Sequence, residues 1–272
     1  MKRLFYFALI FTLLVAIVFS GCKSSAEKET EKQSGTLQFS ANGEDFVRQG
    51  FVSKDGWNIT FDHVYVTLAD VTAYQSDPPY DAEEGGEIQA KTDVSLSETY
   101  TVDLAEGGED VSPILVDKID APVGQYNAIS WNMVKAPEGP AKGYSLVIVG
   151  KAVKEGRTVN FTIKDEEGYE YAGGEYVGDE RKGIVKEDGT ADLEMTFHFD
   201  HIFGDAETDA DDELNVGAPG FDPFAALAED GTLDVDLAAL KTKLSPADYQ
   251  KLEDMIVTLG HVGEGHCHCE VR

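Results

Sequence analysis

Apolar and polar side chains alternate along residues 191–200. Successive side chains of a β-strand point to opposite faces of its sheet, so this alternation predicts a strand with one buried face. The apolar positions of the strand are Leu193, Met195, Phe197 and Phe199. The polar positions put His198 and Asp200 side by side on the outer face, and His201 follows where the strand ends.

Similar patterns predict further strands elsewhere in the chain. They cover residues 36–40, 57–74, 128–133, 144–153 and 158–164, and the last two form a hairpin around Gly156. His63 falls on the apolar side of the 57–74 strand, which favours a buried histidine. A bulge near Asp62 would instead turn it outward.

The pattern changes to helical spacing near the C-terminus. Short helices are predicted over 217–228 and 235–244, and a longer one starts at the N-cap Ser245, with Pro246 in its first turn. One face of the longer helix is apolar, and Gly260 is the predicted stop. The residues of this face are Tyr249, Leu252, Met255, Ile256 and Leu259. Docking of this face on the β core would also position the tail that follows.

These elements predict a mainly β fold. We expect an antiparallel β-sandwich over residues 36–203, followed by a C-terminal α-helical appendage over residues 204–272 that holds an acidic loop, helices and a His/Cys-rich tail.

The N-terminus predicts export. Two basic residues precede an apolar run that ends in Ser20-Gly21-Cys22, the pattern of a signal peptide over residues 1–21. The cysteine after Ser-Gly resembles the lipobox of bacterial lipoproteins. This resemblance implies lipidation of Cys22 and a place in the cell envelope on the periplasmic or extracellular face; the alternative is an uncleaved N-terminal anchor. Residues 23–35 hold no apolar side chain larger than alanine, so we expect a flexible tether over 22–35.

A second resemblance concerns the β domain. The segment Pro122-Val123-Gly124-Gln125-Tyr126 resembles the strand entry of secreted β-sandwich domains in uncharacterised bacterial lipoproteins, a likeness that covers about residues 36–200. It implies a fold and no particular activity.

Charge excludes one class of partner. The chain has a formal charge of −29, and loss of Lys2 and Arg3 with the signal peptide would make it −31. Such a protein repels nucleic acid and concentrates cations. After lipidation of Cys22 only Cys267 and Cys269 remain as thiols, and one intervening residue is too short for an unstrained disulfide.

The strongest chemical signal is the distribution of histidine. Five of the six histidines lie either at the end of the 191–200 strand or in the last dozen residues, beside both thiols. Imidazole, thiolate and carboxylate suit zinc first and copper second. The candidate ligands are His198, Asp200, His201, His261, His266, Cys267, His268 and Cys269. Consecutive donors at 266–269 cannot all reach one ion, so two or three of them are expected to join the strand histidines. The alternative is a disordered tail with incidental donors.

Other chemistries have weaker signals. The acidic run from Asp205 to Asp212 offers oxygen ligands for calcium, but Ala210 stands where an EF-hand needs glycine, and a plain acidic surface loop is the alternative. No nucleophile motif or phosphate-binding glycine loop occurs. His198, Asp200 and His201 also resemble the facial triad of non-haem iron enzymes, which needs an open cleft.

Together these features predict a non-enzymatic, membrane-tethered lipoprotein. We expect it to bind a divalent transition metal for buffering, sensing or delivery, with a metal transporter or a cell-surface protein as partner. The alternative function is a structural or adhesive β-sandwich that binds a glycan or a protein.

Overall fold

The structure is a computed structural model and describes residues 33–108, 111–174 and 182–272. The predicted signal peptide (1–21), the lipidation site Cys22 and most of the predicted tether lie outside these residues. Strand β1 begins at Ser34, so the last two residues of the predicted tether belong to the folded part. Within the described ranges, no helix combines the length and the apolar character needed to cross a membrane.

The protein is mainly β, as expected, and its two larger sheets are mixed rather than purely antiparallel. Most strand pairs are antiparallel, but β1 pairs with β13 in parallel and β10 pairs with β14 in parallel. In spatial order, the first sheet contains β16 (Gly265–His266), β15 (Gly260–Val262), β13 (Thr190–Phe197), β1 (Ser34–Asn42) and β6 (Ile114–Pro122).

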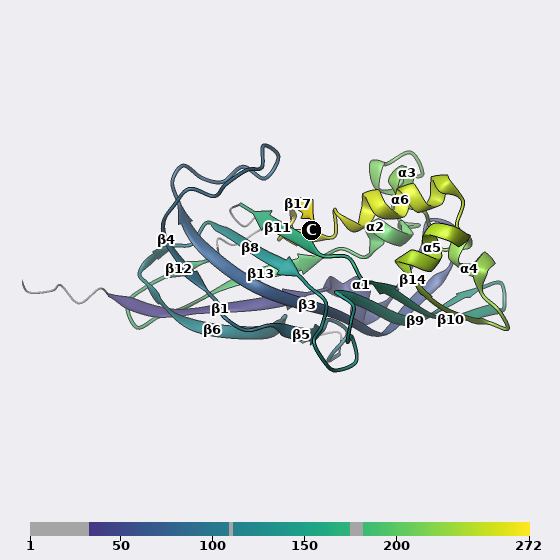
Figure 1. Cartoon of the computed structure of the whole chain (residues 1–272), viewed down its shortest axis with the longest axis horizontal. Coiled ribbons are helices and arrows are strands. Elements are labelled where there is room, and N and C mark those ends of the chain that lie inside the picture. The colour runs from purple at the N-terminus through teal and green to yellow at the C-terminus, as the bar shows by residue number, and fades with distance from the viewer. Residues whose placement is uncertain (1–32, 109–110, 175–181) are drawn as a thin grey trace, which may run out of the picture. The chain divides into compact units, whose positions relative to one another are not determined.

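The second sheet is organised around β3, the long strand near the middle of Figure 1. Its main path contains β14 (Thr232–Asp236), β10 (Arg157–Asp165), β9 (Leu146–Lys154), β3 (Asn58–Ser76), β8 (Ala128–Met133), β11 (Tyr169–Gly173) and β17 (His268–Val271). Three further strands pair with β3, namely β2 (Phe51–Val52), β4 (Ala90–Ser95) and β5 (Tyr100–Asp103). A separate small sheet joins β7 (Gly124–Gln125) to β12 (Ile184–Val185).

Five of the helices of the described chain follow β13 and gather at one end of the sheets, whereas α1 (Glu44–Gln49) follows β1 (Figure 1). The five are α2 (Asp200–Phe203), α3 (Glu213–Gly217), α4 (Asp222–Leu227), α5 (Leu237–Lys243) and α6 (Pro246–Ile256). The start of α6 is confirmed, because the Ser245 side chain accepts a hydrogen bond from the Asp248 backbone N–H. The predicted 235–244 helix is partly wrong. Residues 235 and 236 belong to β14, and Asp236 caps α5 by accepting from Ala239 N–H.

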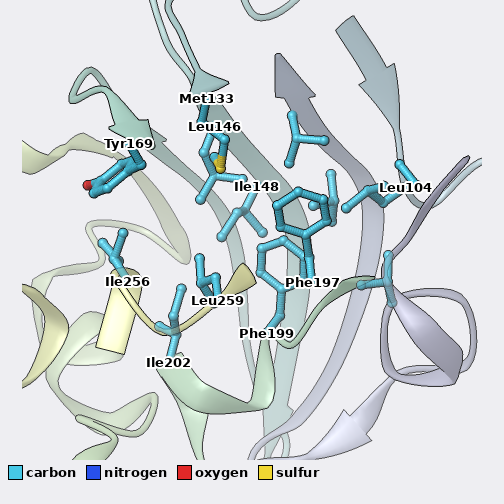
Figure 2. Close-up of a cluster of buried hydrophobic side chains, with 14 of the residues drawn as sticks. Leu104, Met133, Leu146, Ile148, Tyr169, Phe197, Phe199, Ile202, Ile256 and Leu259 are labelled. Atoms are coloured by element: carbon cyan, nitrogen blue, oxygen red, sulfur yellow. The ribbon is translucent and has the colours of Figure 1, made fainter. Parts of the chain in front are cut away.

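One core joins the two larger sheets and the helices. Figure 2 shows Ile202, Ile256 and Leu259, which come from α2, α6 and the segment after α6, in the same cluster as Leu146 and Ile148 of β9. The apolar face predicted for the longer helix therefore reaches the β core through Leu252, Ile256 and Leu259, which are at most 3% exposed. Burial of this face holds the C-terminal segment against the end of β13.

Gly260 has a different role from the predicted helix stop. Helix α6 ends earlier, at Ile256, and Gly260 opens β15. A Cβ atom at this position would lie only 2.4 Å from Cδ1 of Tyr171, so glycine permits the close approach of the tail to β11. The tail itself forms strands: β15 joins the first sheet and β17 joins the second.

Candidate metal centre

Three histidines from separate elements meet at the end of β13. His198 directly follows β13, His201 lies in α2, and His261 lies in β15. Strand pairing places His261 opposite Thr196 of β13, and the His198 backbone N–H donates to the Leu259 carbonyl at 3.1 Å. One ring nitrogen of each histidine lies within 4.8 Å of the others. We call these three residues the histidine cluster.

Aromatic packing fixes the turn that carries two of the three residues. Phe199 and Phe203 are fully buried, and their ring centroids lie 6.3 and 6.4 Å from that of Phe61. Residues four apart share one face of a helical turn, so burying the two phenylalanines leaves His198 and His201 on the opposite side. The strand predicted to reach residue 200 therefore ends at Phe197, where the chain turns into α2.

The prediction that His198 and Asp200 lie on an outer face was wrong. His198, Asp200 and His201 are 9%, 7% and 8% exposed. Pairing of β15 with β13 and docking of α6 cover this side of the strand. The alternation of apolar and polar residues along one strand cannot reveal that a distant segment of the chain covers its polar face.

The three imidazole rings pack closely. The rings of His198 and His261 are stacked, with centroids 3.9 Å apart and planes inclined by 6°. The His201 ring is inclined by 75° to both of the others, at 5.6 Å from His198 and 5.1 Å from His261. Three cations could not share so small a space, so the cluster requires mostly neutral rings.

Burial keeps two of the rings neutral. It lowers the pKa of His201 to about 4 and that of His261 to about 2, and the neighbouring histidines add to both shifts. Burial also acts to lower the pKa of His198, but the adjacent Glu44 carboxylate outweighs it, and this pKa lies above its usual value. Neutral imidazole is the form that binds a metal ion.

Thr258 fixes the tautomers of two rings. Its hydroxyl donates to the Met255 carbonyl at 2.9 Å, so it accepts from His201 Nδ1–H at 2.7 Å. Its carbonyl accepts from His261 Nε2–H at 3.1 Å. The lone pairs of His201 Nε2 and His261 Nδ1 therefore remain for another partner. His261 Nδ1 is buried and has no hydrogen-bond partner among the described residues. Hydrogen bonds that orient the far nitrogen are characteristic of metal-binding histidines.

Two more predicted ligands border the cluster. The exposed His266 of β16 has its ring 4.3 Å from that of His261. The Asp200 carboxyl is buried, which raises its pKa, and its Oδ1 has no hydrogen-bond partner in the described chain. A pocket of about 430 Å³ beside the cluster provides access from solvent. It is lined by His201, His266, Thr258, Asp212, Glu213, Leu214 and Met255.

The remaining predicted donors lie elsewhere. Between His266 and His268 the chain crosses from the first sheet to the second, which separates Cys267, His268 and Cys269 from the cluster. Burial raises the pKa of the Cys267 thiol well above its usual value and that of Cys269 to about 12, so both are protonated at neutral pH. The His268 ring lies near Gly85 and 3.8 Å from the Glu270 carboxylate.

The acidic run is ordered by an amide. Asn215 Nδ2 donates to the carbonyls of Asp205, Thr208 and Asp209, at 2.8 to 3.2 Å. The Asp205 carboxylate in turn accepts from Glu207 N–H and the Thr208 hydroxyl. The amide group thus occupies the place where these carbonyls converge.

His63 lies near the start of β3 and follows the bulge alternative. The register of β3 against β9 shifts between Phe61 and His63, and His63 is turned to solvent, where its Nδ1 lies 2.6 Å from Asp103 Oδ2.

Two residues of the site had no signal in the sequence. Thr258 lies just beyond α6, and Glu44 lies at the start of α1, where its carboxylate reaches to 3.4 Å from His198 Nε2. Neither belongs to a motif. Comparison with protein-family models, with curated proteins and with solved structures gives no match. Function is therefore inferred from the geometry of the site.

Proposed function

We propose that the protein is an exported, membrane-tethered lipoprotein that binds a divalent transition metal at the histidine cluster. Zinc is the first candidate and copper the second. The ion would be buffered, sensed or handed to a transporter at the cell envelope, without an enzymatic reaction. The proposal includes a fold of two facing sheets, a β-sandwich, with the C-terminal helices as an appendage that delivers His261.

The convergence of three imidazoles, two of them held neutral by burial and with their free lone pairs assigned, carries this proposal. A tetrahedral zinc ion with Zn–N bonds of about 2.0–2.1 Å places its ligand nitrogens about 3.3 Å apart. The cluster nitrogens lie within 4.8 Å of one another, so binding requires the rings to approach further. It also requires the stacked rings of His198 and His261 to tilt, because the lone pair of an imidazole nitrogen lies in the plane of its ring. A buried acceptor such as His261 Nδ1 costs free energy when it stays unpaired, and a metal ion would remove that cost.

A competition titration of untagged protein against a chromophoric zinc chelator tests the proposal. We expect one tight zinc site in the parent and its loss in the His198→Ala, His201→Ala double variant. A matched double variant, His63→Ala with His268→Ala, removes two histidines that lie outside the cluster and should bind zinc as the parent does. Equal zinc affinity of the parent and the first double variant would contradict the proposal.

A second prediction concerns Thr258. Replacement by valine keeps the shape of the side chain but removes the acceptor of His201 Nδ1–H, and such orienting groups contribute about 10- to 100-fold to metal affinity. We expect Thr258→Val to weaken zinc binding by that factor. Thr258→Ser keeps the hydroxyl and should stay within about threefold of the parent on the same scale. A valine variant with parental affinity would remove Thr258 from the site.

A further inference from the structure

Glu44 faces the histidine cluster from a part of the chain that none of the predicted ligands occupies. It is the first residue of α1, which follows β1 in the chain, and its Oε1 lies 3.4 Å from His198 Nε2. The His198 nitrogen is buried, yet the pair lacks hydrogen-bond geometry and the nitrogen has no hydrogen-bond partner among the described residues. A buried imidazole nitrogen thus faces a carboxylate at a longer distance than an ordinary hydrogen bond, and the charge of that carboxylate raises the pKa of His198.

The separation of the two atoms suits a shared ion. Zn–N bonds of about 2.0–2.1 Å and Zn–O bonds of about 2.0–2.2 Å, at a tetrahedral angle, place the two ligand atoms about 3.3–3.5 Å apart. The 3.4 Å between His198 Nε2 and Glu44 Oε1 falls within this range. His261 Nδ1, the other partnerless ring nitrogen of the cluster, belongs to the ring stacked on His198.

The backbone of Glu44 is held in an unfavourable conformation. Its φ is +57°, in the left-handed region that favours glycine. Asn42 stabilises this turn: its Oδ1 accepts from Glu44 N–H at 3.0 Å, while its Nδ2 donates to Glu194 Oε1 at 2.9 Å. Strained non-glycine residues that are held in place by their surroundings are concentrated at binding sites. Glycine would relieve the strain at this position.

We propose that Glu44 is the fourth ligand and completes a set of three imidazoles and one carboxylate. This inference rests on the proposed metal-binding function, and it narrows the choice of metal ion. A carboxylate is a hard ligand that favours divalent cations, whereas Cu(I) prefers thiolates and thioethers. The two thiols nearby are outside the cluster and protonated at neutral pH. The site therefore selects Zn(II) or a similar divalent ion over Cu(I).

His266 fits the fourth position less well. It is exposed, and its ring lies nearest to that of His261, at 4.3 Å, and 5.8 Å from that of His201. No ring contact joins it to His198, whose unpaired nitrogen faces Glu44. His266 thus borders the pocket side of the cluster, whereas Glu44 lies on the His198 side.

The test compares zinc and Cu(I) affinity in the full mature chain, without an affinity tag. We expect Glu44→Gln to lower zinc affinity by about 100-fold or more, because loss of a charged ligand should cost at least as much as loss of a group that orients a ligand. Its Cu(I) affinity, measured against a chromophoric Cu(I) chelator, should stay within about threefold of the parent. Asp45→Asn removes the same charge from the neighbouring exposed side chain and should leave both affinities unchanged.

A second variant is the control for correct folding. Glu44→Gly adopts a φ of +57° without strain, so its metal-free form should melt no lower than the parent, while its zinc affinity falls as in Glu44→Gln. A Co(II)-loaded parent should show the intense visible absorption of a four-coordinate site, and Glu44→Gly should lose intensity.

The outcomes separate the two proposals. A parent that binds no zinc overturns the proposed function itself. A parent that binds zinc, with Glu44→Gln binding it equally well, overturns only the role of Glu44. Loss of zinc binding in Asp200→Asn but not in Glu44→Gln would assign the fourth position to Asp200 and also overturn it.

Discussion

Zinc is expected to raise the melting temperature of the mature protein by about 8–16 °C when free zinc is 1,000 times its dissociation constant. A ligand at this excess stabilises the folded state by about 4 kcal/mol, and each kcal/mol shifts the melting temperature of a chain of this size by about 2–4 °C. The gain requires that zinc binds the folded state only. His198 and His201 meet His261 only after β15 has paired with β13, so the unfolded chain does not contain the cluster.

The His/Cys tail reduces this gain. Cys267 and Cys269 are protonated and packed against the core in the folded protein, but unfolding exposes them beside His266 and His268. We expect an exposed segment of this composition to bind zinc in the unfolded state and to offset part of the stabilisation. The parent should therefore fall toward the lower end of the range, and Cys267→Ala with Cys269→Ala should move it upward.

His261→Ala is the matched control for the thermal shift. His261 is 2% exposed, so this variant also loses packing and melts lower without metal. The comparison is therefore made within each variant, with zinc and with chelator. We expect a zinc-induced shift of less than about 2 °C in His261→Ala, corresponding to less than about 1 kcal/mol. A parental shift in this variant would show that zinc stabilises the protein elsewhere.

The sequence could predict which segments meet at the site. Alternation marked the strand that ends near residue 200, and the spacing of Leu252, Ile256 and Leu259 required the last helix to dock on the core. Docking of that helix brings His261 back to β13, where the structure pairs it with Thr196. Both patterns can be read from the sequence, because a buried face repeats an apolar residue at every turn of a helix and at every second residue of a strand.

The sequence could not predict what surrounds these residues. Burial of His198 depends on the pairing of Thr196 with His261 and of Phe197 with Gly260, residues far apart in the chain, which no local period encodes. Thr258 orients two histidine rings through its own hydroxyl and carbonyl, and Glu44 reaches His198 through one carboxylate beside a strained turn. Single residues of this kind leave no repeating pattern in the sequence. The tail at 266–269 was also beyond prediction, because its crossing between two sheets depends on the pairing of β16 with β15 and of β17 with β11.

The stability of the metal-free protein is expected to fall by about 4 kcal/mol between pH 4 and pH 8 through one carboxyl group. Asp165 ends β10 and is 1% exposed. Burial raises its pKa from 3.8 to about 7, although hydrogen bonds from Glu167 N–H and the Tyr169 hydroxyl, each 2.7 Å long, act in the opposite direction. A difference of about three pH units between unfolded and folded pKa corresponds to about 4 kcal/mol.

The direction follows from which state binds the proton more tightly. The folded state does, so the contribution of Asp165 is fully present below pH 3.8 and is lost as the pH rises through about 7. Asp165→Asn stays neutral at every pH and should lack this loss. Urea unfolding of both proteins in chelator, from pH 4 to pH 8, measures the difference. We expect the variant to become the more stable of the two above pH 7.

Tyr169 provides an independent check of the same group. Its hydroxyl donates to the Asp165 carboxylate and holds the pKa lower than burial alone would set it. Tyr169→Phe should therefore move the midpoint of the stability loss to higher pH, whereas Asp211→Asn, which removes an exposed acid, should leave it in place. A difference between the parent and Asp165→Asn that stays constant from pH 4 to pH 8 would show that Asp165 titrates alike in the folded and unfolded chains, and that its two hydrogen bonds cancel the cost of its burial.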